Sequence, residues 1–308
     1  MRIAVIDLGT NTFNLLVADG QAASPISVVY REEAGVKIGQ GGILKKTITS
    51  QAFQRGLKAV ERHMKKATSF DPQRILVVAT SGIRSAENGP LFIERIQKDF
   101  DVGVEVITGD REAALIYRGV RQSVDLGNDP ALIIDIGGGS NECILASETQ
   151  IIWKQSFDIG MARVLERFRP SDPITSQEIL DIRQYYDEAL RPLHRQIGKY
   201  PPQKLVGCAG TFESLRSILT AGGFSLSTSP NQPYFEIPYR EFARLHQRLL
   251  NSTSHERQHI KGLELFRVDM IVLASIFVNF IMEKYGFDRL VQSDYSIKEG
   301  VVDECLNP

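Results

Sequence analysis

Asp7 and Asp135 have the surroundings in this chain that are best suited to phosphate chemistry. Each ends an apolar segment, precedes a glycine-bearing turn and leads into a second apolar segment, in IAVIDLGTNTFNLLVAD (residues 3–19) and ALIIDIGGGSNECILAS (residues 131–147). Glycine lets backbone N–H groups approach an anion without a Cβ in the way. A single turn of this kind is commonly structural, but two copies that align without a gap indicate a duplicated phosphate-binding unit.

We expect both turns to bind phosphate through backbone N–H groups and small polar side chains. The expected residues are Asp7, Gly9, Thr10, Asn11 and Thr12 in the first copy, and Gly137, Gly138, Gly139, Ser140 and Asn141 in the second. A duplicated unit places the two turns opposite one another across a cleft, where a polyphosphate could be held from both sides.

The two copies differ at one informative position, because Asn14 in the first corresponds to Glu142 in the second. Glu142 adds a second carboxylate near Asp135. Since Mg²⁺ prefers one or two carboxylates together with phosphate oxygens and water, this pair predicts a Mg²⁺ site on the side of the second turn. The alternative is that Glu142 points outward from the returning strand.

Two further charged residues follow predicted strands. Arg84 comes after VVATSG, at a strand's carboxyl end, where a guanidinium can hold phosphate; an ordinary surface arginine is the alternative. Glu112 lies in TGDREAALIYRGV, in the first turn of a predicted helix. A carboxylate there is favourable for the helix dipole alone, so the residue type by itself does not assign it a role.

Two weaker motifs point in other directions. LVGCAGTFESL (residues 205–215) is a third small-residue turn before a helix, suited to a nucleotide or another phosphate or simply to close packing. His255 to His259 matches HExxH, the pattern of zinc peptidases, but its surroundings are polar and Gly262 ends any helix soon after. We expect a solvated helix or loop there.

The composition is that of an ordinary globular protein, with 43% hydrophobic and 24% charged residues in 308. A formal net charge of -1 gives no global signal for nucleic acid or membrane, so we expect neither partner and any anion site to be local. The chain has three cysteines and no CxxC pair, and its N-terminus lacks a signal-peptide pattern, so we expect a cytoplasmic protein. A homodimer is an open alternative for its assembly.

Strand and helix patterns alternate along the chain, which predicts an α/β class with two domains. Each half begins with three strands and then alternates with helices. The turn-rich stretch SVDLGNDP (residues 123–130) predicts the boundary, giving domains of residues 1–125 and 126–308, with the helix at 296–308 able to return to the first. We interpret the apolar run at 270–282 as a buried helix and residues 222–238 as a long loop.

The chain resembles the exopolyphosphatase and guanosine pentaphosphate phosphohydrolase family over nearly its full length. The matching stretches are IAVIDLGTNTF, VVATSGIRSAEN, ITGDREAALIYRGV, LIIDIGGGSNE, LVGCAGT and SDYSIKEGVVDE. The resemblance implies a duplicated actin-like, ribonuclease H-like fold with an interdomain cleft. Sugar kinases share the paired turns but lack the GDREA and TSGIR elements.

The resemblance implies Mg²⁺-assisted release of terminal phosphate from inorganic polyphosphate, or of the 5′ γ-phosphate of guanosine pentaphosphate. Glu112 then corresponds to the catalytic glutamate that activates water, Asp135 and Glu142 to the acidic residues of the second turn, and Arg84 to a phosphate-contacting arginine. Lys37 and Gln40 stand where the family commonly has Arg and Glu. The alternatives are a non-catalytic sensor of guanosine tetra- or pentaphosphate and an actin-fold small-molecule kinase.

Overall fold

The computed structural model describes residues 1–224 and 232–308 and contains two β-sheets. The strands of the first sheet are β1 (Arg2–Leu8), β2 (Thr12–Asp19), β3 (Ser27–Gly35), β4 (Arg74–Ala79) and β5 (Val104–Val106). The strands of the second sheet are β6 (Ala131–Ile136), β7 (Asn141–Ala146), β8 (Ile151–Phe157), β9 (Lys204–Cys208), β10 (Tyr234–Pro238) and β11 (Arg289–Ser293).

The second sheet repeats the topology of the first. The spatial orders are β3-β2-β1-β4-β5 and β10-β11-β9-β6-β7-β8. In each sheet the first three strands are antiparallel and the following strands, β4 and β5 or β9 and β11, add in parallel. Among the strands of the described residues, β10 alone has no counterpart, and it lies at the edge of the second sheet. The sequence repeat is thus a structural duplication, which confirms the predicted α/β, actin-like fold class.

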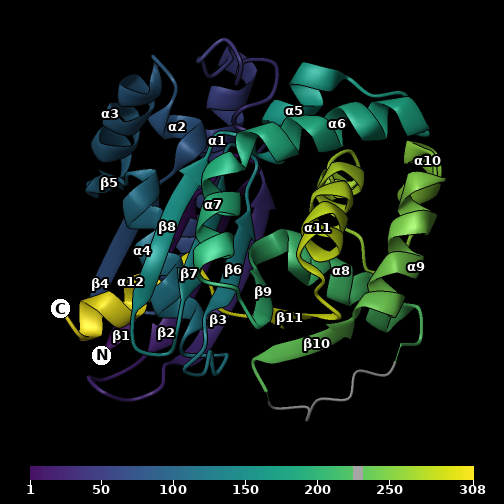
Figure 1. Cartoon of the computed structure of the whole chain (residues 1–308). Helices are drawn as coiled ribbons and strands as arrows, with labels where there is room; N and C mark the ends of the chain where they lie inside the picture. Colours follow the sequence, from purple (N-terminus) through teal and green to yellow (C-terminus); the bar gives the residue numbers. More distant parts are fainter. Residues whose placement is uncertain (225–231) are drawn as a thin grey trace.

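Helices cover both faces of both sheets (Figure 1). In the first half they are α1 (Ser50–Thr68), α2 (Ser81–Arg84), α3 (Gly89–Phe100) and α4 (Gly109–Val120). In the second half they are α5 (Met161–Phe168), α6 (Ser176–Ala189), α7 (Arg191–Lys199), α8 (Ala209–Ala221), α9 (Tyr239–Leu250), α10 (Ser254–Arg257), a 3₁₀ turn (Leu265–Arg267), α11 (Ile271–Tyr285) and α12 (Ile297–Leu306).

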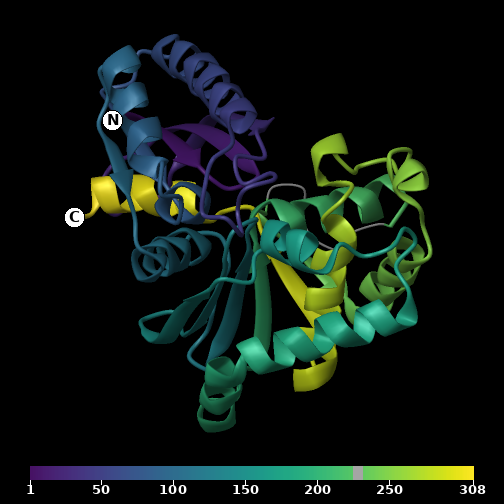
Figure 2. The ribbon, with the colours of Figure 1, turned by 90° about the horizontal axis from the view of Figure 1, so that it is seen from above.

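The sheets and helices pack together around three apolar cores. Strand β1 alternates, so Ala4 and Ile6 face a core shared with α1 and α3, whereas Ile3 and Val5 face a central core that holds α4 and α12 between the two sheets. Figure 2 shows α1 and α12 on opposite faces of the first sheet. The C-terminal helix therefore packs on the first half of the chain, as the sequence allowed.

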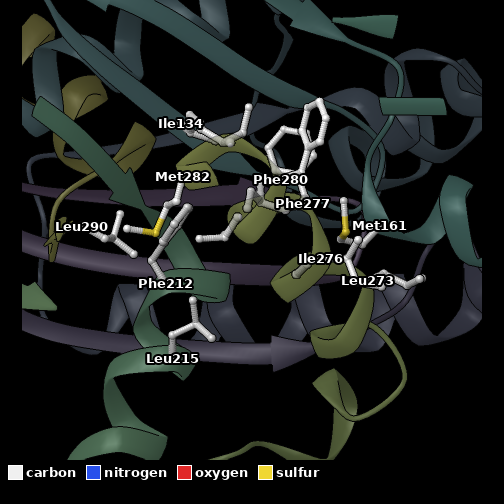
Figure 3. Close-up of a cluster of buried hydrophobic side chains, with 14 of the residues drawn as sticks. Ile134, Met161, Phe212, Leu215, Leu273, Ile276, Phe277, Phe280, Met282 and Leu290 are labelled. Carbon is white, nitrogen blue, oxygen red and sulfur yellow. The ribbon is translucent and has the colours of Figure 1, made fainter. Parts of the chain in front are cut away.

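The third core lies on the outer face of the second sheet and is the largest. Figure 3 shows side chains of β6, α5, α8, α11 and β11 meeting there, among them Phe212 and Phe277. Helix α11 is buried along Ile271 to Met282, which confirms the predicted buried helix. No helix within 1–224 and 232–308 has both the length and the apolar character needed to cross a membrane.

Helices α4 and α12 cross through two glycines, and this crossing positions the site. A Cβ on Gly119 would collide with the carbonyl of Ser296, and one on Gly300 with the carbonyl of Leu115. Only glycine at these positions lets the two backbones approach so closely. The contact fixes α4, and with it the residues of its first turn, between the two sheets.

One element was predicted wrongly. The sequence interpretation made residues 222–238 a loop because they are rich in Gly, Ser and Pro, but β10 occupies Tyr234–Pro238 and pairs antiparallel with β11. Residues 225–231 of that predicted loop lie outside the described residues. The proposed division of the chain at residues 125 and 126 stays a prediction.

Candidate active site

The two predicted phosphate turns share one backbone geometry. The N–H of Gly9 donates to the carbonyl of Thr12 at 3.1 Å, and the N–H of Gly137 donates to that of Ser140 at 3.0 Å. A Cβ on Gly9 would lie 2.7 Å from the Thr12 carbonyl oxygen, and a Cβ on Gly137 would lie 2.7 Å from that of Ser140. Each turn therefore needs its glycine to close the hairpin, and the duplication extends to the hydrogen bonds.

The turns face one another and touch. A Cβ on Gly138 would lie 2.5 Å from the amide carbon of Asn11, and one on Gly139 would lie 2.6 Å from the hydroxyl of Thr10. Arg163 supports the second turn by donating from Nε to the carbonyl of Gly139 at 2.7 Å. The expected arrangement of two turns across a cleft is thus present.

A cavity of about 110 Å³ lies between the turns. Its lining includes all the predicted phosphate and metal residues other than Arg84 and Asn141, namely Asp7, Gly9, Thr10, Asn11, Thr12, Asp135, Gly137, Gly138, Gly139, Ser140 and Glu142. Glu112 also lines it. Residues that are far apart in sequence therefore meet at one site.

The difference between the copies lies at this cavity. Asp7 pairs across the strands with Asn14, which donates from Nδ2 to Oδ2 of Asp7 at 3.1 Å, and Oδ1 of Asp7 is buried without a hydrogen-bond partner in the described residues. The equivalent pair in the second sheet is Asp135 and Glu142, two carboxylates. Hence the aspartate of the first copy receives one side-chain hydrogen bond from its cross-strand neighbour. In the second copy the cross-strand neighbour of the aspartate is another acid.

The acids of the second copy are electrostatically strained. Both are less than one-tenth exposed. Burial raises the pKa of Asp135 well above its usual range, and the charges of Glu142 and Asp7 raise it further. Burial also raises the pKa of Glu142, although a hydrogen bond of 2.6 Å from the Ser156 hydroxyl opposes the shift. A cation or a proton would relieve this pair.

Glu112 reaches the cavity from the N-terminal turn of α4. Thr108 caps this helix by accepting from the N–H of Arg111 at 3.2 Å. The Glu112 carboxylate accepts from Nη1 of Arg84 at 2.9 Å. Burial, and then the charge of Glu142, raise the pKa of Glu112 well above its usual range, while Arg84 lowers it.

Arg84 and Asn141 do not occupy the predicted positions at the cavity wall. The guanidinium of Arg84 binds Glu112 and the carbonyl of Ile107, at 2.9 and 2.7 Å, so it holds the proposed base. Asn141 is fully buried. It precedes Glu142 in β7, and neighbouring residues of a strand face opposite sides of the sheet. A phosphate contact by either residue stays a prediction.

Two basic side chains that the sequence did not single out also line the cavity. Lys298, at the start of α12, and Arg267, just before α11, both line it. Burial opposes the charge on Lys298, but the carboxylates of Glu299, Glu213 and Asp7 raise its pKa. Lys298 lies within the family-like stretch SDYSIKEGVVDE, which was a usable signal, whereas nothing local marked Arg267.

The described residues offer no closed set of side chains for a metal ion. Within 1–224 and 232–308, no three or more His, Cys, Asp or Glu side chains are grouped to hold a metal ion. In the HExxH segment, Glu256 accepts from the N–H and hydroxyl of Thr253 at 2.8 and 2.9 Å, and α10 has only four residues. Glu256 thus caps its own helix, which does not favour the zinc-peptidase alternative.

The fold and cavity define a duplicated actin-like α/β protein whose paired turns face a common cleft. Residues 16–307 match the model of the Ppx/GppA phosphatase family, and the chain belongs to that family.

Three relatives illustrate the similarity. Exopolyphosphatase 2 of Mycobacterium tuberculosis is 30% identical over 312 residues, covering 97% of each chain. The crystal structure of an exopolyphosphatase from Cytophaga hutchinsonii is 36% identical, with a TM-score of 0.95, and the match covers 100% of this chain and 98% of that one. The Aquifex aeolicus PPX-GPPA enzyme is 24% identical, with a TM-score of 0.79 and 99% of each chain covered, and so shares the fold.

Proposed function

We propose that this protein is an exopolyphosphatase that releases the terminal phosphate of inorganic polyphosphate by Mg²⁺-assisted attack of water. The observation that carries the proposal is that Glu112 and residues of both glycine turns line one cavity. Membership of a phosphatase family and similarity to proteins named exopolyphosphatase support it.

The two turns bind the terminal phosphate through backbone donors. Gly138 and Gly139 lie in the turn rather than in a strand, and their N–H groups have no acceptor within the described part of the chain. Lys298 and Arg267 also line the cavity and add positive charge there. Phosphoryl transfer depends on such positioning and charge neutralisation more than on covalent chemistry.

Glu112 activates the attacking water. Its carboxylate accepts a proton from the water as the new P–O bond forms, and the shortened polyphosphate leaves with the electrons of the broken P–O bond. A raised pKa suits this role because a base works best when its pKa approaches the working pH. Arg84 orients the carboxylate.

Asp135 and Glu142 fit Mg²⁺. The pair is buried, is acidic and lacks an ion-pair partner among the described residues, so a divalent cation matches its charge. Because the chain offers too few ligands for a closed site, phosphate oxygens and water would complete the coordination of a bound Mg²⁺. Bound there, Mg²⁺ supplies charge neutralisation at the phosphate.

Guanosine pentaphosphate is the second candidate substrate. The cavity wall extends to Ala209, Gly210 and Thr211 at the N-terminus of α8, where a further phosphate could bind. The same catalytic residues would then release its 5′ γ-phosphate.

The test is phosphate release from long polyphosphate, tripolyphosphate and guanosine pentaphosphate, with Mg²⁺ and with EDTA. We expect Mg²⁺-dependent release from polyphosphate. Micromolar binding of a guanosine nucleotide without turnover of any substrate would instead favour a sensor. Transfer of labelled γ-phosphate from ATP to a small acceptor would favour a kinase.

A further inference from the structure

We propose that the outer face of α1 is a docking groove for the non-reacting part of a long polyphosphate chain, extending the proposed active site. The groove lies between α1 and β3 and has a volume of about 630 Å³. Because this inference rests on the proposed function, its test uses substrates of two lengths at the same active site.

The groove concentrates positive charge in a chain that is otherwise nearly neutral. Its cations are Lys58, Arg62, Lys65 and Lys66, and its acids are Glu32 and Glu61. The cations recur at spacings of three and four residues, which places them on one face of the helix. Against a formal net charge of -1 for the whole protein, this local excess favours a polyanion.

The existing partners leave these lysines available. Lys58 is exposed and has no ion pair among the described residues. Lys65 binds Glu61 at 2.7 Å, but both side chains are more than half exposed, so solvent weakens the pair. Lys66 lies over the rings of Tyr30 and Phe70, at 4.6 and 5.2 Å, with its ammonium held at the groove. Arg62 is paired with Glu32.

A short segment joins this groove to the first phosphate turn. The N–H groups of Lys37 and Ile38 donate to the carbonyls of Asn11 and Thr10, both at 2.8 Å. On its other side the segment is held by Arg55 of α1, which donates to the carbonyl of Lys37 at 3.1 Å and to the side chain of Gln40 at 3.1 Å. Arg55 thus begins the basic face of α1 directly behind the phosphate turn.

A side cavity adjoins the catalytic cavity beside Asn11 and Met270, whose side chains contact each other through Nδ2 and Sδ at 2.9 Å. It has a volume of about 310 Å³ and shares Asn11 and Met270 with the catalytic cavity. Lys37, Gln40 and Arg169 line it together with Glu166 and Asp269, and Lys37 pairs with Asp269 at 3.1 Å. A chain that leaves past Asn11 would meet Lys37, then Gln40 beside Arg55, and then the face of α1, where Arg55 to Lys66 spans about 16 Å of helix.

The test compares substrate lengths in a Lys58→Gln, Lys65→Gln, Lys66→Gln triple variant. We expect KM for long polyphosphate to rise about tenfold with kcat unchanged, and its salt dependence to weaken, because fewer counterions are displaced on binding. Turnover of tripolyphosphate, which is too short to reach the groove, should be unchanged and also reports that the variant is folded.

The matched control replaces three exposed lysines elsewhere, Lys98→Gln, Lys199→Gln and Lys261→Gln, with the same change in net charge. An equal KM increase in the control would assign the effect to global charge and overturn the groove. An unchanged KM in the triple variant would show a merely solvated helix face, and an equal loss with tripolyphosphate would place the effect in the catalytic cavity. If the wild type released no phosphate at all, the proposed function would fail instead.

Discussion

The first and second phosphate turns are closed by equivalent hydrogen bonds but differ in the number of carboxylates beside them. Gly9 and Gly137 close equivalent hairpins, but Asp7 faces the amide of Asn14, whereas Asp135 faces the carboxylate of Glu142. The two copies therefore share the backbone geometry of the turn and differ in the charge beside it. Both turns offer backbone donors to phosphate, and the cation that accompanies the phosphate is expected at the second turn, where two carboxylates lie side by side.

The proposed base, Glu112, lies on α4 and not on either turn. A substitution of Glu112 should therefore affect the reaction without changing the turns. Glu112→Gln keeps the size of the side chain but removes its basicity, so we expect kcat for tripolyphosphate to fall by about 10² to 10⁴ with little change in binding. Rapid-quench phosphate release at saturating substrate measures this loss.

Arg84→Lys provides the control for Glu112. It keeps a positive charge but loses the planar donor pattern, so it should disturb the orientation of Glu112 and reduce kcat less than Glu112→Gln does. Full activity of Glu112→Gln would mean that the base is one of the acids in the turns after all.

Glu112 reaches the cavity only while α4 stays in place between the two sheets. Gly300→Ala should push α12 from α4, lower the free energy of unfolding by about 3 kcal/mol and reduce activity through displacement of Glu112. Urea denaturation with parallel assays would measure both effects.

Gly198→Ala is the matched control, because Gly198 is an exposed position of α7 where a Cβ meets open space. We expect it to stabilise the protein by about 0.5 kcal/mol. Equal destabilisation by the two substitutions would contradict the account of the α4 and α12 crossing.

The electrostatic difference between the turns should be visible in stability without substrate. Because the folded state raises the pKa of Glu142, its protonated form is favoured, and stability falls as the pH rises above the usual glutamate range. Glu142→Gln removes this loss, so in EDTA the variant should be about 1 kcal/mol more stable than the wild type at pH 8.

That difference should shrink near pH 4, where the wild-type carboxylate is protonated as well. Thermal unfolding at the two pH values measures it. A variant less stable than the wild type at pH 8 would show that the Glu142 charge is already compensated within the protein.

Much of this site follows from sequence because its parts are local. A strand, an aspartate and a glycine turn are contiguous, and the pairing of Asp135 with Glu142 follows from the length of the hairpin. Strand alternation also predicts that Asn141, next to Glu142, faces away from the cavity, although the repeat pattern alone suggested otherwise.

The rest depends on tertiary contacts. Lys298 and Arg267 reach the cavity only because α12 and the turn before α11 return to it from the far end of the chain. Arg84 follows a strand, as predicted, but its partner is Glu112, which lies on another element. Likewise, β10 forms because β11 offers an edge, and no local pattern in the sequence records that edge.

The most direct test of the central claim is the binding of Mn²⁺, an EPR-visible substitute for Mg²⁺, in the presence of inorganic phosphate. We predict one Mn²⁺ per chain for the wild type and for Asn14→Ala, and loss of binding in Glu142→Gln. Equal binding by Glu142→Gln and the wild type, or loss in Asn14→Ala alone, would contradict the assignment of the cation to the second turn.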